Sequence, residues 1–368
     1  MQSQAVERIV DEVWSRAVRK IAKGPAQASL RAGLGDEINL VIPQAVVSTL
    51  MRVNPGFSHV LYSSAYASSK RNAYLMTRQL GMPPDFFWKF DYWSPERAFE
   101  TLKKVMGRVF AAVMTRQNQG TFDLTAVDVE RCRFEMAFAD CAECSGLEAA
   151  NPMCLFHAGL FAGIVGALLD RDLDAVETEC RASGAKACVF KVGKPEDREI
   201  KPALEQRLGG AAFQVDVAKR VGESLDGRAV RGELGDLVDV WYYQLLLSSV
   251  FLAHLDVLSA ACMDAGEELG QAMATRMPQR FHGDAASAVS AFYRDLLYTR
   301  TRIVEQPGLG VVVEVEEAPE TMGPLSDATL MPFLCGELQG LLSTLMQRPL
   351  RFQSGQRQGE HLVLRFAP

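Results

Sequence analysis

Apolar residues recur at helical spacing near the start of the chain. In residues 5–22 they fall on one face, at Val6, Ile9, Val10, Val13, Trp14, Ala17, Val18 and Ile21. This i, i+3, i+4, i+7 pattern predicts an amphipathic helix, which the following Lys-Gly-Pro ends. A second helix is predicted over 213–225, after a polar segment, 193–202, with two prolines and six charged residues. Such a segment is typical of a linker between domains.

The pattern of the first half of the chain repeats in the second half. A Leu-Gly-Asp turn, a short apolar strand and a helix begin at Leu34 and again at Leu234. A Gly-x-x-x-Gly helix begins near Gly159 and again near Gly336, and strand-like segments follow each helix. The repeat predicts an α+β protein with two tandem copies of one domain. We expect an N-terminal helix in 1–32, a first domain in 33–193, a linker with a connecting helix in 194–231 and a second domain in 232–368.

The glycine-rich helix of the first copy predicts a close contact with another element. Gly159, Gly163 and Gly166 lie within one apolar run that ends at Leu169. A pair of membrane helices would need a longer apolar span than this run offers. We therefore expect the glycines to allow this helix to pack closely on a sheet.

Composition and charge exclude several classes of protein. The 368 residues carry a net charge of −6 and no basic stripe, which argues against direct binding of nucleic acid. The longest apolar run, residues 155–169, is too short to span a bilayer, and acidic residues near the N-terminus argue against a secretory signal. We expect a cytoplasmic protein, in which eight cysteines favour metal ligation or buried thiols over disulfides.

Three cysteines and one glutamate have a spacing that suits a metal site. Cys154 precedes the glycine-rich helix, and Glu177, Cys180 and Cys188 follow in a predicted hairpin that Gly184 would help to turn. Three thiolates and a carboxylate can form a closed tetrahedral zinc shell. By spacing alone Glu179 could replace Glu177, and the cysteines could also be buried core residues.

Other candidate groups lie close to this set in the sequence. Cys141 and Cys144 form a Cys-x-x-Cys motif, and Cys132 precedes them on a predicted strand. The motif could be a redox pair, a second metal site, or thiols without a role beside the zinc loop. His157, three residues after Cys154, could support the metal site, line a cavity or be a core residue.

The residues from Cys154 to Val192 resemble the signature of the 4-vinyl reductase (hydrocarbon-binding) domain family, and Gly35–Met51 is similar to its opening. The resemblance covers Gly33–Gly193 and, more weakly, 232–368. It implies a structural zinc bound by Cys154, Glu177, Cys180 and Cys188. The equivalent positions of the second copy fall near Met331, Ser354, Arg357 and Leu362, so the resemblance implies no zinc there.

The resemblance also implies a fold and a ligand. The fold would be similar to that of the TRAPP small subunits and of NO-signalling ligand-binding domains, with a cavity for a small hydrophobic molecule. The candidate lining residues are Tyr66, Phe86, Phe87, Trp88, Phe134, Phe138, Phe156, His157 and Phe161. Phenol-sensing members use a histidine and a tryptophan where this chain has Ala98 or Phe99 and Ala137 or Phe138, which favours an apolar ligand over phenol.

Three functional interpretations remain open at this point. The first is a non-enzymatic sensor or carrier that acts through a protein partner, because no Walker A motif or helix-turn-helix segment is recognisable in the sequence. The second, from the family name, is an enzyme or accessory protein of tetrapyrrole (bacteriochlorophyll-type) metabolism. No nicotinamide or flavin motif is recognisable, which argues against a stand-alone reductase. The third is a dimerisation scaffold, compatible with the first and with a homodimer.

Overall fold

The computed structural model describes most of the chain. The described residues are 31–79, 94–110, 114–115, 117–128, 130–209, 215–232, 234–251, 254–277, 281, 284–306, 310–322, 332–358 and 361–368, with Arg8, Glu12 and Ser15. These last three are helical, and the rest of the predicted N-terminal helix lies outside the described residues. The pocket candidates Phe86, Phe87 and Trp88 also lie outside them.

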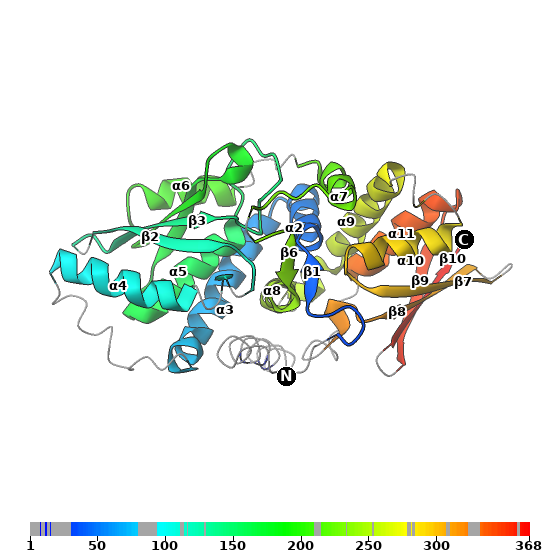
Figure 1. Ribbon diagram of the computed structural model, residues 1–368, viewed down its shortest axis with the longest axis horizontal. Coiled ribbons are helices and arrows are strands. Elements are labelled where there is room, and N and C mark those ends of the chain that lie inside the picture. The colour runs from blue at the N-terminus through cyan, green and yellow to red at the C-terminus, as the bar shows by residue number, and fades with distance from the viewer. Residues whose placement is uncertain are drawn as a thin grey trace.

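Two four-stranded antiparallel sheets lie at opposite ends of an elongated molecule (Figure 1). The first has the order β2-β3-β5-β4, from β2 (Thr121–Asp128), β3 (Arg133–Ala139), β4 (Asp174–Glu179) and β5 (Cys188–Gly193). The second has the order β7-β8-β10-β9, from β7 (Arg300–Gln306), β8 (Gly310–Glu316), β9 (Arg351–Gln358) and β10 (His361–Ala367). In each half one helix connects the second and third strands, α5 (Leu155–Leu169) and α11 (Pro332–Leu345). The predicted α+β class is confirmed.

The two Leu-Gly-Asp segments meet at the centre of the molecule. The strands that follow them, β1 (Glu37–Asn39) and β6 (Leu237–Asp239), pair antiparallel with Ile38 opposite Val238. The helices α2 (Val41–Val53) and α8 (Val240–Leu246) come directly after these strands, as the sequence predicts. The halves are therefore joined by a ladder of backbone hydrogen bonds.

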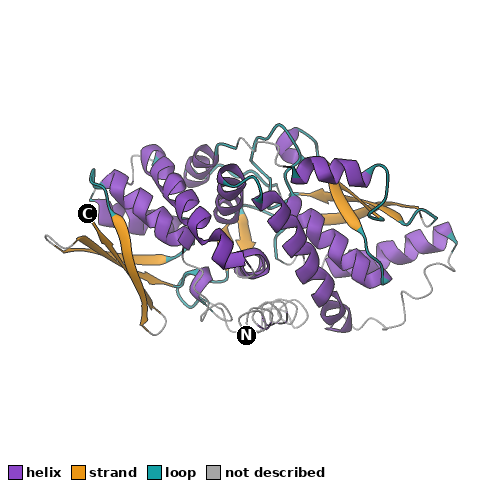
Figure 2. Ribbon diagram, turned by 180° about the vertical axis from the view of Figure 1, so that it is seen from behind, coloured by secondary structure: helices purple, strands orange, loops and turns teal. Residues whose placement is uncertain are grey.

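The remaining helices lie between the two sheets or pack against one of them, as the view from behind shows (Figure 2). They are α3 (Phe57–Gln79), α4 (Pro95–Phe110), α6 (Ile200–Leu208), α7 (Val217–Leu225), the π-helix η4 (Leu247–Phe251), α9 (Leu255–Arg276), α10 (Ala285–Asp295) and the 3-10 turns η3 (Arg181–Ser183) and η7 (Pro319–Thr321). Within the described part of the chain, none of the helices has the length and apolar character needed to cross a bilayer.

The predicted strand region of residues 127–138 differs from the structure in one respect. It contains the end of β2, a turn and β3, rather than a single strand. Cys132 lies in that turn, with a φ of 54°, and not on the strand where the sequence placed it. The turn lets β2 and β3 pair as an antiparallel hairpin.

The sequence led us to expect that the glycines of α5 pack on a sheet, but Gly159 and Gly163 face the helix α3, and Gly166 faces the backbone of Arg171 after α5. A Cβ atom added to Gly159 would lie 2.3 Å from the carbonyl oxygen of Tyr62 in α3. In the second half, a Cβ atom added to Gly336 of α11 would lie 2.0 Å from the carbonyl oxygen of Met263 in α9. Helical periodicity shows that a face is buried but not which element covers it. Both halves therefore use glycine for close helix–helix packing.

One arginine near each Leu-Gly-Asp segment forms hydrogen bonds with the opposite half of the chain. Arg31 donates hydrogen bonds to the carbonyl oxygen of Glu37 at 2.5 Å and to that of Leu297, in the second half, at 2.7 Å. Arg231 donates to the carbonyl oxygen of Leu237 at 2.7 Å and to that of Asn118 in the first half. The two halves thus exchange equivalent contacts across the centre.

Residues with a left-handed backbone conformation occur in both halves. Each one in the first half lies nearly the same number of residues before its counterpart in the second half. These residues, none of them glycine, are Asn118, Asp140 and Asp170 in the first half and Leu297, Glu317 and Gln347 in the second. Each has a φ between 50° and 57°, a conformation that side chains other than glycine rarely adopt. Corresponding turns of the two halves therefore have the same backbone shape.

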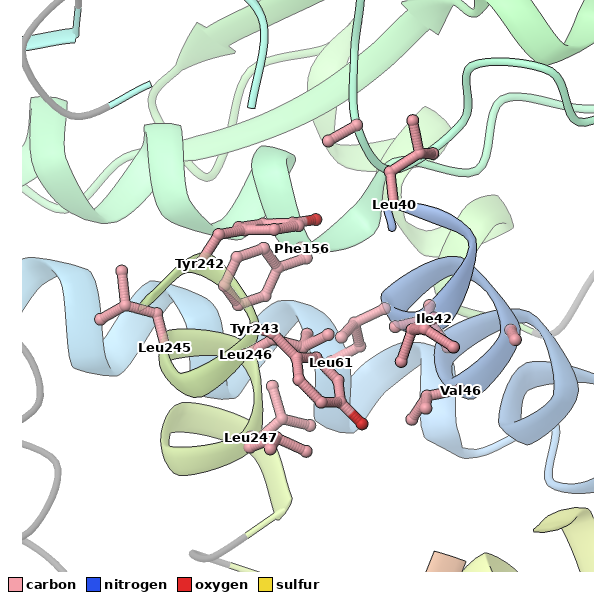
Figure 3. Packing of buried hydrophobic residues seen from close by; sticks show 14 of the residues in the cluster. Leu40, Ile42, Val46, Leu61, Phe156, Tyr242, Tyr243, Leu245, Leu246 and Leu247 are labelled. Carbon is pink, nitrogen blue, oxygen red and sulfur yellow. The ribbon is translucent and has the colours of Figure 1, made fainter. Parts of the chain in front are cut away.

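The core continues from one half into the other. Figure 3 shows its centre, where residues of α8 and the first residue of η4 lie among side chains of α2, α3 and α5. These residues are Tyr242, Tyr243, Leu245, Leu246, Leu247, Ile42, Val46, Leu61 and Phe156. The rings of Tyr242 and Phe156 are in edge contact, with centroids 6.1 Å apart. The N-terminal end of α5 therefore packs directly on a helix of the other half.

Candidate metal centre

The four predicted zinc ligands lie together where α5 meets the β4–β5 hairpin. Cys154 is the residue before α5, Glu177 is on β4, Cys180 follows β4 and Cys188 begins β5. All four side chains are buried, and their donor atoms lie within 4.8 Å of one another. The fold thus brings together the four residues that the family resemblance implies.

Glu177 has one oxygen atom without a partner. Its Oε2 accepts a hydrogen bond from the backbone N–H of Cys154 at 2.8 Å, whereas Oε1 is buried and makes no hydrogen bond. Burial, together with the nearby thiolates of Cys180 and Cys188, raises the pKa of Glu177 well above its usual range. An unpaired carboxylate is costly in a core, and a cation at this point would compensate it. Glu179, the alternative, is exposed.

The sulfur positions fit a tetrahedral thiolate shell. The Sγ atom of Cys154 lies 3.9 Å from those of Cys180 and Cys188. With zinc–sulfur bonds of about 2.3 Å, the edge of a tetrahedron is about 3.8 Å. The donor set, its burial and its spacing therefore suit a closed four-ligand zinc site.

The hairpin places Cys180 and Cys188 through two local features. The pairing of β4 with β5 shifts by one residue between Glu177 and Glu179, as in a β-bulge. After Cys180 the chain makes the turn η3 and continues through Gly184, whose φ of 95° is the left-handed conformation for which the sequence predicted a glycine. The hairpin folds back so that both thiols point to the start of α5.

The Cys-x-x-Cys motif joins the same cluster. Cys141 Sγ lies 3.6 Å from Cys154 Sγ, and Cys144 Sγ lies 3.3 Å from Cys188 Sγ. These four thiols form a second group whose donor atoms all lie within 4.8 Å of one another. Cys132 is not part of either group, because it lies at the opposite end of β3, about 20 Å of extended strand away.

Glu143 and His157 form a buried pair beside the thiols. Glu143 accepts hydrogen bonds from the backbone N–H groups of Phe156 and His157, each at 3.1 Å, and lies 2.7 Å from Nδ1 of His157. Burial lowers the pKa of His157, but the Cys141 thiolate and Glu143 outweigh this and raise it to about 10. His157 therefore supports the start of α5. Sequence reasoning missed Glu143, because it lies twelve residues before α5, too far along the chain to show a helix-start signal.

The aromatic pocket candidates fall into separate places. Phe138 and Phe161 belong to a buried ring cluster with three further residues, Phe110 of α4, Phe122 of β2 and Phe190 of β5. We call these five rings the aromatic cluster; the sequence did not single out the last three. Phe134 is buried on the same face of β3, and Phe156 instead contacts Tyr242. Tyr66 is half-buried and donates a hydrogen bond to Asp172 at 3.2 Å.

An open cavity of about 410 Å³ lies between α2, α7 and α9. Its lining mixes charged and apolar residues and contains none of the candidate residues. The lining residues are Thr49, Arg52, Val215, Asp216, Val217, Ala218, Glu268, Leu269, Ala272 and Arg276.

Comparison with known proteins bears on the segment that contains the cysteines. Residues 132–194 match the family model of the 4-vinyl reductase domain. Three uncharacterized proteins of Methanocaldococcus jannaschii are similar to the chain, with 39% identity over 54 residues, 40% over 53 and 32% over 90. These matches cover 14%, 14% and 24% of this chain and 34%, 29% and 50% of the relatives. The chain thus spans half or less of the length of the relatives that it matches. The family resemblance is confirmed where the cysteines lie: residues 132–194 are a 4-vinyl reductase domain.

Proposed function

We propose that the first half of the chain binds a small apolar molecule as a regulatory or carrier domain stabilised by a structural zinc ion. The observation that carries this proposal is the family match over 132–194, because a 4-vinyl reductase domain suggests small-molecule binding and regulation. The matched residues include all four proposed zinc ligands and part of the aromatic cluster.

Zinc would act here by holding the fold together. Cys154, Glu177, Cys180 and Cys188 would fill all four positions of a tetrahedral ion, so no position would remain for a substrate. The ion would link the start of α5 to the β4–β5 hairpin and supply the partner that Glu177 Oε1 lacks. Such a site contributes its binding free energy to folding.

The aromatic cluster is the proposed place for the ligand. Its rings come from α4, α5 and three strands, with centroids 4.4 Å apart for Phe110 and Phe122 and 4.9 Å apart for Phe161 and Phe190. Rings fill the space between α4 and the sheet, so a ligand would enter by displacing α4 or rotating rings. His157 is already engaged by Glu143, which leaves few polar partners and favours a hydrocarbon-like ligand.

The second half would be a degenerate copy of the same domain. Its strand order, its glycine-rich helix and its left-handed turns repeat those of the first half. Tyr242 of α8 contacts both Phe156 and His157, so a change at α5 would reach the second half directly. We infer that the second half passes the binding signal to a protein partner or to a second copy of the chain.

Thermal unfolding with added ligand tests the binding proposal. Naphthalene, toluene and palmitate are apolar molecules of different shapes. At least one of them should raise the melting temperature in a saturable way, because binding stabilises the folded state. Phe122→Trp adds volume within the aromatic cluster and should abolish the shift. Phe352→Trp is the matched control, because Phe352 is an equally half-buried ring in the second sheet.

Two outcomes would contradict the ligand proposal. One is the absence of a saturable shift with all three compounds. The other is a shift that Phe122→Trp leaves intact and Phe352→Trp removes, which would place the ligand in the second half.

A further inference from the structure

A single zinc ion would leave two thiols of the cluster unused. Cys141 and Cys144 lie 3.6 Å and 3.3 Å from Cys154 and Cys188, two of the proposed ligands. Both are fully buried. The donors form two overlapping groups of four, and the groups share Cys154 and Cys188.

Buried polar contacts hold the Cys-x-x-Cys turn in place. The side-chain amide of Gln44 donates hydrogen bonds to the carbonyl oxygens of Ala142 at 2.9 Å and Ser145 at 3.0 Å. Within the turn, the N–H of Ser145 donates to the carbonyl oxygen of Cys141 at 2.9 Å. Glu143, between the two cysteines, binds the start of α5. Both thiols are therefore fixed against Cys154 and Cys188 before any ion binds.

The sulfur–sulfur contacts divide into two shells. Cys141 to Cys154 and Cys144 to Cys188 belong to one group of four donors, and Cys154 to Cys180 belongs to the other. The contact between Cys154 and Cys188, at 3.9 Å, is an edge that both groups contain. Two tetrahedral ions that share an edge would use all six donors.

We propose that this cluster binds two divalent, thiolate-preferring metal ions, with Cys141 and Cys144 as terminal ligands of the second ion and Cys154 and Cys188 bridging the two. The proposal rests on the zinc site of the proposed function and extends it. Each thiol that binds releases its proton to solvent. Five thiolates and one carboxylate around two divalent ions carry a net charge of −2, the same as three thiolates and one carboxylate around a single ion. The second ion therefore adds no net charge to the core.

The second half of the chain supplies a matched variant. Gln244 donates to the carbonyl oxygens of Pro319 and Met322 as Gln44 does to those of the first half, so the same turn forms there. That turn has Ala318 and Thr321 where the first half has Cys141 and Cys144. The double variant Cys141→Ala/Cys144→Thr copies a sequence that already forms this turn, and we expect it to fold.

Native mass spectrometry of the full chain, purified under reducing conditions and loaded with Zn²⁺, measures the number of ions. We expect two zinc ions in the parent protein and one in Cys141→Ala/Cys144→Thr. The control Cys262→Ala/Cys335→Ala removes two buried cysteines of the second half and should keep two ions. In a Co²⁺ titration, the sulfur-to-cobalt absorption of the parent should rise through two equivalents and that of the double variant through one.

Three outcomes would overturn the proposal, and each of them includes a single ion in the parent protein. One ion in the parent, retained by the double variant, removes the second ion but leaves the proposed zinc site intact. One ion in the parent, lost in the double variant and kept in Glu177→Gln, assigns a single ion to the four-cysteine group and contradicts the predicted ligands as well. One ion together with a Cys141–Cys144 disulfide, seen as a loss of two hydrogens, identifies a redox pair.

Discussion

The turns that precede α5 and α11 accept equivalent hydrogen bonds at their backbone but carry different side chains. In both halves a glutamine of a helix earlier in the chain, Gln44 of α2 or Gln244 of α8, donates hydrogen bonds to a turn that contains a buried glutamate. In the first half that glutamate, Glu143, pairs with His157 next to five thiols. In the second half it is Glu320, which accepts hydrogen bonds from Tyr243 and Tyr298. The backbone frame therefore does not require cysteine, and the thiols of the first half are an addition to it.

The second half buries two glutamates, Glu320 and Glu337, close to tyrosines. Glu337 of α11 is fully buried, and burial raises its pKa to about 8, although Tyr293 lowers it. Burial raises the pKa of Glu320 as well. The hydroxyl groups of Tyr243 and Tyr298 donate hydrogen bonds to Glu320. The comparison thus contrasts a buried glutamate beside thiols, where a cation would compensate its charge, with a buried glutamate that tyrosine hydroxyl groups contact.

Loss of zinc should separate the two halves most clearly. We expect Cys180→Ser to remove the ion and to destabilise the first half by roughly 10 kcal/mol, the order of a structural zinc site. Hydrogen exchange followed by mass spectrometry should show loss of protection in α5 and the β4–β5 hairpin while α11 stays protected. Cys335→Ser, on α11, is the matched control and should leave α5 protected. A Cys180→Ser protein that exchanges like the parent would refute the structural role of zinc.

Titration of Glu337 should affect only the second half. Its pKa is raised in the folded state, so the unfolded chain binds fewer protons between about pH 4.5 and 8, and stability falls as pH rises through that window. At about 1.4 kcal/mol per pKa unit, the loss from pH 5 to 8 is about 4 kcal/mol at most. Urea unfolding at intervals across this range should show a slope that Glu337→Gln reduces.

The half-exposed Glu305 on β7 provides the control for this titration. Glu305→Gln should leave the dependence on pH unchanged. An unaltered slope in Glu337→Gln would show that this carboxyl group does not carry the linkage.

Alanine at the helix–helix contacts should affect both halves alike. Gly159→Ala and Gly336→Ala would each place a Cβ atom within 2.3 Å of a carbonyl oxygen of the neighbouring helix. Such overpacking costs about 1–3 kcal/mol, which urea unfolding measures. Gly107→Ala in α4 meets no atom within 4 Å and should stabilise the protein by about 0.5–1 kcal/mol. A large loss in only one half would show that the two contacts are not equivalent.

The sequence predicted local features better than contacts between distant segments. The turn at Gly184 and the grouping of Cys154, Cys180 and Cys188 with an acidic residue follow from spacing within one hairpin and one helix start, and the family resemblance selected Glu177 over Glu179. The position of Cys141 and Cys144 in the fold could not be derived, because Gln44, which holds their turn through hydrogen bonds, lies about a hundred residues away in the sequence. The expectation that Gly159 packs on a sheet was wrong for the same reason, since periodicity identifies a buried face and not the element that covers it.

Substitution of the two arginines that contact the opposite half should have a small effect on stability. Arg31→Lys and Arg231→Lys keep the charge but lose the planar group that reaches several carbonyl oxygens at once. Each should lower the free energy of unfolding by about 1 kcal/mol, the scale of a net hydrogen bond, with more where a buried carbonyl loses its donor. Hydrogen exchange should increase near Leu297 in the first variant and near Asn118 in the second, because those are the carbonyls that each arginine holds in the opposite half. Increased exchange confined to the half that carries the substitution would show that the exchanged contacts do not couple the two halves.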